Sequence, residues 1–149
     1  MKAGPKRMLC ADDNLCYRHF MSRFLGINRC EVAEAGTATE VLSLVRRRPG
    51  DYDLLIIADW LPDMDGVELI QTLRSIPYTG GIVVTAPKLL PYRRAAYEAL
   101  GVSAALITPV CHSDLLRILE LLRTDRIGTH WPDRPDDATS SGAQDSSAP

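Results

Sequence analysis

The sequence has little that would anchor a protein in a membrane or charge it strongly. No apolar run approaches the ~20 residues that a membrane-spanning helix needs. The N-terminus has no apolar segment of signal-peptide length, and we therefore expect a cytoplasmic protein without a membrane partner. The formal net charge is only −2, which gives no indication of nucleic-acid binding.

Cysteine and histidine are few, and neither residue type is grouped as a zinc site requires. There is no C-x-x-C pair, and no Cys/His cluster has zinc spacing. Three of the four cysteines fall in apolar or periodic segments, which predicts buried, reduced thiols, with redox sensing as the alternative. The histidines are scattered and indicate no catalytic group. These residues are Cys10, Cys16, Cys30, Cys111, His19, His112 and His130.

The end of the sequence lacks the residues of a hydrophobic core. After Trp131 there is no Ile, Leu, Val, Phe or Met, and the segment from Pro132 carries four Asp and one Arg. That segment contributes −3 to the net charge of −2, so the preceding residues carry +1. Such a composition buries too little apolar surface to offset its ordering entropy. We expect one folded domain at 1–124 and a largely disordered C-terminal tail at 125–149.

Strand-like apolar runs alternate with amphipathic helical patterns along the chain. This alternation predicts an α/β fold with a parallel sheet covered by helices on both faces. Right-handed crossovers and the chain length favour the doubly wound, flavodoxin-like (βα)5 arrangement with strand order 2-1-3-4-5. The expected strands are 7–11, 30–36, 54–58, 80–86 and 103–107, and the expected helices are 14–26, 37–48, 66–75, 91–101 and 111–124.

Acidic residues follow two strands that this order makes neighbours. Asp12 and Asp13 end the first strand, and Asp59 ends the third. The carboxyl ends of these strands form a crevice where the chain reverses direction. Like charges held close require a cation or a proton, and Mg²⁺ takes one or two carboxylates with water and phosphate oxygens. The pattern predicts a magnesium site, with helix capping by 12–14 and an ordinary loop acid at Asp59 as the alternatives.

The ordered set of motifs resembles a response-regulator receiver domain of two-component signalling. Besides the three acids, the resemblance is carried by "DWLPDMDG" after the third strand, "VVTA" in the fourth and "GVSAALITPV" around the fifth. It covers about residues 6–123. It implies a phosphoprotein of signal transduction or a phosphorelay, and a phosphoacceptor domain rather than an enzyme.

The resemblance also implies roles for particular residues. Asp59 would be the phosphoacceptor, and Thr85 would donate its hydroxyl to a phosphoryl oxygen. Asp13 would bind Mg²⁺ directly, Asp12 through water, and Leu61 through its backbone carbonyl. The implied partners are a sensor histidine kinase or phosphotransfer protein and a downstream protein. Whether the fourth helix, fifth strand and fifth helix form a homodimer interface stays open.

Two departures from the family pattern affect the same site. Thr108 occupies the position of a lysine that the family places before the fifth-strand proline, and it offers only a neutral hydroxyl there. Ala105 occupies the position of an aromatic residue that turns inward on activation. Lys88 is a conceivable replacement for the charge, although a solvated loop lysine is favoured. Tyr92 or Tyr97 is a conceivable replacement for the aromatic, with ordinary surface or core roles as the alternative.

Several other residues near the predicted site are expected to take no part in its chemistry. Arg93, Arg94 and Arg117 are expected to be solvated charges, with a contribution to an interface as the alternative. Leu61 and Pro87 are expected to flank the phosphoryl group. Because both side chains are apolar, neither would orient an attacking water, and we expect slow self-dephosphorylation.

Two other functions compete with a phosphate-accepting receiver. A degenerate receiver would retain the acids but act as a phosphorylation-independent interaction module, which the missing lysine and aromatic favour. The intact acids, Thr85 and "PDMDG" favour phosphoryl acceptance. A flavin-binding electron carrier of the same topology is the weaker alternative, because "ADDNLC" would repel a phosphate in the absence of a metal. Since no second folded domain is expected after the last helix, output would pass through contacts with another protein.

Overall fold

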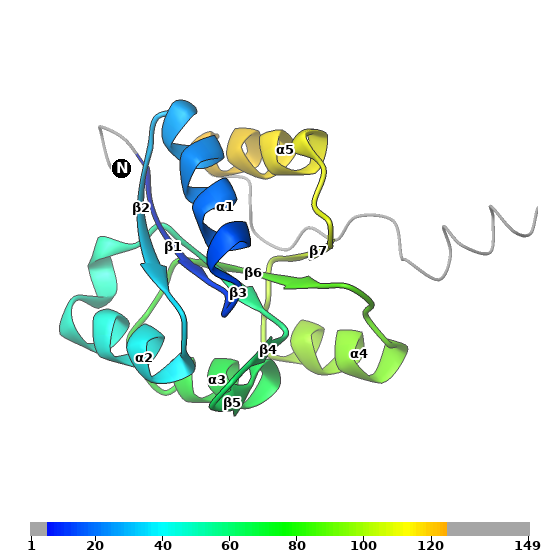
Figure 1. The fold of residues 1–149 in the computed structure, drawn as a ribbon. Helices are drawn as coiled ribbons and strands as arrows, with labels where there is room; N and C mark the ends of the chain where they lie inside the picture. The colour runs from blue at the N-terminus through cyan, green and yellow to red at the C-terminus, as the bar shows by residue number, and fades with distance from the viewer. Residues whose placement is uncertain (1–5, 125–149) are drawn as a thin grey trace, which may run out of the picture.

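A five-stranded parallel sheet forms the centre of the molecule, which was obtained as a computed structural model that describes residues 6–124 (Figure 1). The strand order is β2-β1-β3-β6-β7, which is the predicted order 2-1-3-4-5 counted along the chain. The doubly wound α/β fold is therefore confirmed. The predicted tail at 125–149 lies outside the described residues. The strands are β1 Lys6–Ala11, β2 Cys30–Ala35, β3 Leu54–Ala58, β6 Gly81–Ala86 and β7 Ala104–Ile107.

The helices divide between the two faces of the sheet. Helices α1 (Leu15–Ile27) and α5 (His112–Arg123) cover one face, and α2 (Ala38–Arg47), α3 (Gly66–Leu73) and α4 (Pro91–Ala99) cover the other (Figure 1). A short 3-10 turn, η1 (Pro49–Asp51), follows α2. Within the described residues, no helix is both long and apolar enough to cross a bilayer.

The central strand β3 is buried along its whole length, as its unbroken apolar sequence predicts. Its alternate side chains enter two separate cores. Leu55 and Ile57 join the core beneath α2, α3 and α4, whereas Leu54 and Ile56 join the core beneath α1 and α5. Because both faces of β3 are covered, its carboxyl end is the place where this strand reaches the surface.

The acidic loop after β3 forms a short hairpin that the sequence pattern did not indicate. Strands β4 (Trp60–Leu61) and β5 (Met64–Asp65) pair antiparallel. Asp63 accepts hydrogen bonds from the backbone N–H groups of Ala38 and Thr39 at 2.8 and 3.0 Å, at the start of α2. Asp65 caps α3 by accepting from the N–H of Val67 at 2.9 Å. Two acids of this loop therefore hold helix N-termini, where carboxylates are favoured.

The cysteine prediction is right about free thiols but only partly right about their burial. All four are free, and Cys10 and Cys30 are buried, but Cys16 and Cys111 are exposed. Cys16 lies near the start of α1 on its outer side, and Cys111 precedes the first turn of α5. The helical pattern placed Cys16 and Cys111 at helices, but it did not show which side of each helix faces the core.

Candidate functional site

The register of the sheet brings the ends of β1, β3 and β6 to one edge. Ala11 pairs with Ile57 in the β1–β3 ladder, and Ala58 pairs with Thr85 in the β3–β6 ladder. The backbone N–H of Asp59 donates to the carbonyl of Thr85 at 2.8 Å, which extends that pairing beyond the strand. Thr85 is 3% exposed. Parallel strands thus place the acids that follow β1 and β3 at the same edge as Thr85.

Asp12 and Asp13 form an acidic pair at the end of β1. Burial raises the pKa of the Asp12 carboxyl, and the neighbouring negative charge of Asp13 raises it further. Asn14 is the N-cap of α1, since its side chain accepts from the N–H of Tyr17 at 2.9 Å. Asp12 Oδ1 also accepts the backbone N–H of Asn14 at 2.9 Å, so a structural role at the start of α1 accounts for Asn14 and in part for Asp12, but not for Asp13. The half-buried Asp12 and the exposed Asp13 supply the carboxylate oxygens that a hard divalent cation prefers.

The carboxylate of Asp59 is held by two side chains from helix α4. Arg93 donates to Oδ1 from Nη2 at 2.6 Å and from Nε at 3.0 Å. The hydroxyl of Tyr97 donates to the same Oδ1. The side chains of Asp59 and Arg93 are each 18% exposed, so this ion pair is largely shielded from water.

Arg93 also contacts a second carboxylate, that of Asp65. Its Nη2 donates to Asp65 Oδ1 at 2.6 Å and its Nη1 to Oδ2 at 3.3 Å. The hydrogen bonds that Arg93 donates to Asp65, and then those to Asp59, raise the pKa of Arg93, and the guanidinium in turn holds the pKa of Asp65 below its usual range. The expectation that Arg93 is a solvated charge is therefore wrong. Its planar fork bridges the acid after β3 and the acid that caps α3.

Tyr97 reaches Asp59 from within the core. Its side chain is 0% exposed, and burial, together with the charge of Asp59, raises the pKa of its hydroxyl. The hydroxyl therefore remains a donor at neutral pH. Gly66 makes room for it, because a Cβ at that position would lie 2.6 Å from the Tyr97 hydroxyl and 2.7 Å from the Asp59 carbonyl oxygen. Of the two tyrosines considered for the aromatic role, Tyr97 faces the site, whereas Tyr92 is 69% exposed.

The predicted three-acid magnesium set is not gathered in this conformation. Among residues 6–124, no three His, Cys, Asp or Glu side chains lie together as a metal would need. The side-chain hydrogen bonds to Asp59 end on Oδ1, and among the described residues none ends on Oδ2. The Asp12–Asp13 pair fits a hard cation by its chemistry, while Asp59 is neutralised by an arginine. The ligand set of Asp12, Asp13, Asp59 and Leu61 stays a prediction.

The other predicted residues occupy less direct positions. The backbone N–H of Thr108 donates to the carbonyl of Ala86 at 2.8 Å, which places Thr108 at the same edge as Thr85. Lys88 is exposed in the loop after β6. The Leu61 side chain is 0% exposed and belongs to the core. That Leu61 flanks a phosphoryl group stays a prediction.

The sequence contained one signal for the contribution of α4. Arg93 and Tyr97 are four residues apart, and residues at this spacing lie on one face of a helix. The Arg93 guanidinium carbon lies 5.7 Å from the centre of the Tyr97 ring, as that spacing allows. Nothing in the local sequence separated Arg93 from Arg94, which pairs with Glu98 within the helix at 3.3 Å. The Arg94 side chain is 15% exposed, so the expectation of a solvated charge is wrong for Arg94 as well.

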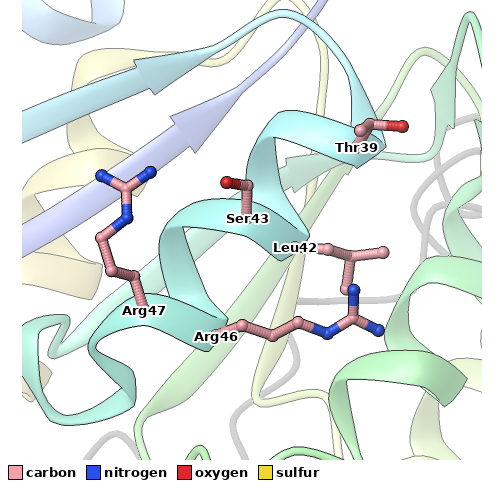
Figure 2. Close-up of a pocket in the computed structure, with 5 residues that line it drawn as sticks. All are labelled: Thr39, Leu42, Ser43, Arg46 and Arg47. Atoms are coloured by element: carbon pink, nitrogen blue, oxygen red, sulfur yellow. The ribbon is translucent and has the colours of Figure 1, made fainter.

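A surface pocket on α2 shares no residue with this acidic site. Thr39, Leu42, Ser43, Arg46 and Arg47 line it, all from one helix. Figure 2 shows the guanidinium groups of the two arginines extending to different sides of the helix. They do not converge on a common ligand position, so the pocket defines no second site.

The chain belongs to the response regulator receiver domain family, whose model matches residues 8–120. Among curated proteins, it is 34% identical over 143 residues to the response regulator MprA of Mycobacterium leprae, covering 92% of this chain and 56% of that protein. It is 27% identical over 120 residues to two-component system protein A of Emericella nidulans, covering 78% of this chain and 17% of that protein. The chain thus spans little more than half of one relative and a small part of the other.

Solved structures give the same family likeness. A CheY-like response regulator receiver domain from Methanospirillum hungatei superposes with a TM-score of 0.75 at 25% identity, covering 81% of this chain and 96% of that one. The chemotaxis response regulator CheY4 of Vibrio cholerae gives a TM-score of 0.71 at 23% identity, covering 79% and 98%. The second likeness supports the fold alone. The chain is a receiver domain of the kind found in two-component response regulators.

Proposed function

We propose that this receiver domain accepts a phosphoryl group on Asp59 in a magnesium-dependent reaction and signals through protein–protein contacts. The observation that carries the proposal is the position of Asp59. It follows the buried central strand, and its side chain is only 18% exposed. A carboxylate that is ionised at neutral pH is a nucleophile without the help of a general base.

The contacts of Asp59 distinguish its two carboxylate oxygens. Arg93 and Tyr97 hold Oδ1, which leaves Oδ2 to attack the phosphorus atom of the donor. A new Oδ2–P bond forms as the donor's P–N bond, or P–O bond in an acyl phosphate, breaks with the leaving group taking the electron pair. Thr85, buried at the end of β6, is the proposed hydroxyl donor to a phosphoryl oxygen. Positioning and charge stabilisation supply most of the catalysis in such transfers.

Asp12 and Asp13 are the proposed magnesium ligands from β1, joined by Asp59 and the Leu61 carbonyl. A bound Mg²⁺ would neutralise charge on the transferring phosphoryl group. The partly desolvated Asp12 and its neighbour Asp13 supply hard oxygen donors whose mutual repulsion a cation relieves. Thr108 contributes at most a neutral hydroxyl.

The proposed donor is a sensor histidine kinase or a phosphotransfer protein, and the proposed output is a contact with another protein. Neither nucleic acid nor membrane is proposed as a partner. In this view the domain is a phosphoacceptor and not an enzyme with a separate substrate.

A degenerate receiver is the second candidate. The ion pair of Asp59 with Arg93 at 2.6 Å favours it, because an acid whose charge is already satisfied has less need of a metal. In that case the same ion pair would only join β3 to α4, and binding to a partner would be independent of phosphate.

Intact-mass measurement after incubation with acetyl phosphate and Mg²⁺ separates the two candidates. We expect the wild type to gain one phosphoryl group, which chelation of the metal prevents. Asp59→Asn is the matched control and should gain none. A wild type whose mass stays unchanged, while it still binds its partner, would favour the degenerate receiver.

A further inference from the structure

Helix α4 contributes to Asp59 the two kinds of group that the family pattern places on its fifth strand. Ala105 in β7 and Thr108, just after it, have neither a cation nor an aromatic ring. Arg93 and Tyr97, one helical turn apart on α4, supply both and hydrogen-bond to the same oxygen of Asp59. The positive charge and the aromatic ring that are absent at β7 are thus provided by α4.

We propose, on the basis of the phosphoacceptor function above, that Arg93 and Tyr97 are the positioning residues of Asp59 and that α4 thereby responds to its phosphorylation. Arg93 is held firmly enough for this role, because it is shielded from water and bridges Asp59 and Asp65. The bridge keeps a cation at the site in every charge state of Asp59.

Phosphorylation changes what Arg93 and Tyr97 contact. Before transfer, Oδ1 shares the negative charge of a carboxylate. After Oδ2 bonds to phosphorus, Oδ1 becomes the carbonyl oxygen of a mixed anhydride, and the negative charge moves onto the phosphoryl oxygens. Charge-assisted hydrogen bonds are roughly twice as strong as neutral ones. Arg93 therefore gains by turning toward the phosphoryl group, and the Tyr97 hydroxyl loses its charged acceptor.

The consequence falls on the exposed side of α4. Leu90, the N-cap, and Tyr92 are exposed large hydrophobic residues on either side of Pro91, three residues and one residue before Arg93. A shift of Arg93 that carries its backbone with it would move these side chains.

If the ion pair of Arg93 with Asp59 were only structural, its loss would leave phosphoryl uptake and the α4 amide shifts unchanged. Matched variants distinguish this possibility from the proposed positioning role. Arg93→Gln removes the cation, and Arg94→Gln is the control, since Arg94 pairs with Glu98 on the same helix. The double variant Arg93→Gln with Thr108→Lys returns a positive charge to the site from β7. Two measurements follow: the rate of phosphoryl uptake from acetyl phosphate with Mg²⁺, and backbone amide shifts of α4 on adding beryllofluoride, a phosphoryl analogue.

We expect Arg93→Gln to slow phosphoryl uptake by about tenfold or more and to abolish the α4 amide shifts, while Arg94→Gln matches the wild type in both. The double variant should recover most of the rate but not the α4 shifts. Should Arg93→Gln fail to fold, Arg93→Lys replaces it and should show an intermediate rate, because an ammonium lacks the fork that spans Asp59 and Asp65.

Three results would overturn the proposal. Wild-type rate and α4 shifts in Arg93→Gln, or in Arg93→Lys where it takes that variant's place, would show that α4 does not position Asp59. Recovery of both rate and shifts in the double variant would show that the charge alone matters, not the helix that carries it. A wild type that takes up no phosphoryl group would remove the proposed function itself, and the inference with it.

Discussion

The guanidinium of Arg93 lies 2.6 Å from Asp59 Oδ1 and 2.6 Å from Asp65 Oδ1, so one side chain of α4 joins the end of β3 to the start of α3. This contact differs from the expectation from the sequence, which was that Arg93 is solvated. The charge that Thr108 lacks is supplied from a different element. Asp59, the acid after β3, is therefore already paired with Arg93 before any metal cation binds.

Substitution of Gly66 tests how closely Tyr97 and the Asp59 backbone pack around this position. A Cβ at this position would lie 2.6 Å from the Tyr97 hydroxyl and 2.7 Å from the Asp59 carbonyl oxygen. We expect Gly66→Ala to lower the free energy of unfolding by about 1–3 kcal/mol, as measured by urea denaturation. Adding Tyr97→Phe should recover only part of this loss, because the Asp59 carbonyl remains in the way. Full stability in Gly66→Ala would contradict the close packing described here.

The ion pair of Arg93 with Asp65 predicts a pH dependence of stability. Arg93 holds the pKa of Asp65 below its usual range, so the stabilisation is complete above the unfolded carboxyl pKa of about 4 and is lost as pH falls below it. The stability difference between wild type and Arg93→Gln should therefore shrink between pH 7 and about pH 3. Thermal unfolding of both proteins across this range measures the difference. A difference that stays constant with pH would count against the pair.

The Asp12–Asp13 pair predicts opposite effects with and without a divalent cation. Burial and the charge of Asp13 raise the pKa of Asp12, so ionised Asp12 is unfavourable in the folded state at neutral pH. Without divalent cations, Asp13→Asn should raise Tm by about 2–4 °C. With Mg²⁺ present, the wild type should gain stability by mass action and the variant should gain little. Equal Mg²⁺-dependent gains in both proteins would place the cation elsewhere.

The fold was predictable because periodicity defines the helices and strands, while crossover handedness and chain length limit how they are ordered. Apolar runs such as Leu54–Ala58 and the alternation of elements define a parallel sheet, and the expected strand order is the one observed. The β4–β5 hairpin was not predicted, since two-residue strands leave no periodic signal. The capping role of Asp63 depends on α2, which is 25 residues away in sequence, so no local pattern could reveal it.

The site was predictable only in part, and for a similar reason. The edge that gathers Asp12, Asp59 and Thr85 follows from strand order. The contacts of Arg93 and Tyr97 with Asp59 span 34 and 38 residues and depend on how α4 packs. Sequence spacing could place both on one face of the helix, but it could not show that this face meets Asp59.

Peptide mapping of the protein after incubation with Mg²⁺ and acetyl phosphate tests the central claim most directly, because it locates the phosphoryl group on a residue. The expected result is a single modified peptide that contains Asp59, present in the wild type, absent from Asp59→Asn and strongly reduced in Arg93→Gln. A phosphoryl group on any other residue, or an unmodified wild type under conditions that fully label a control receiver domain, would contradict the account.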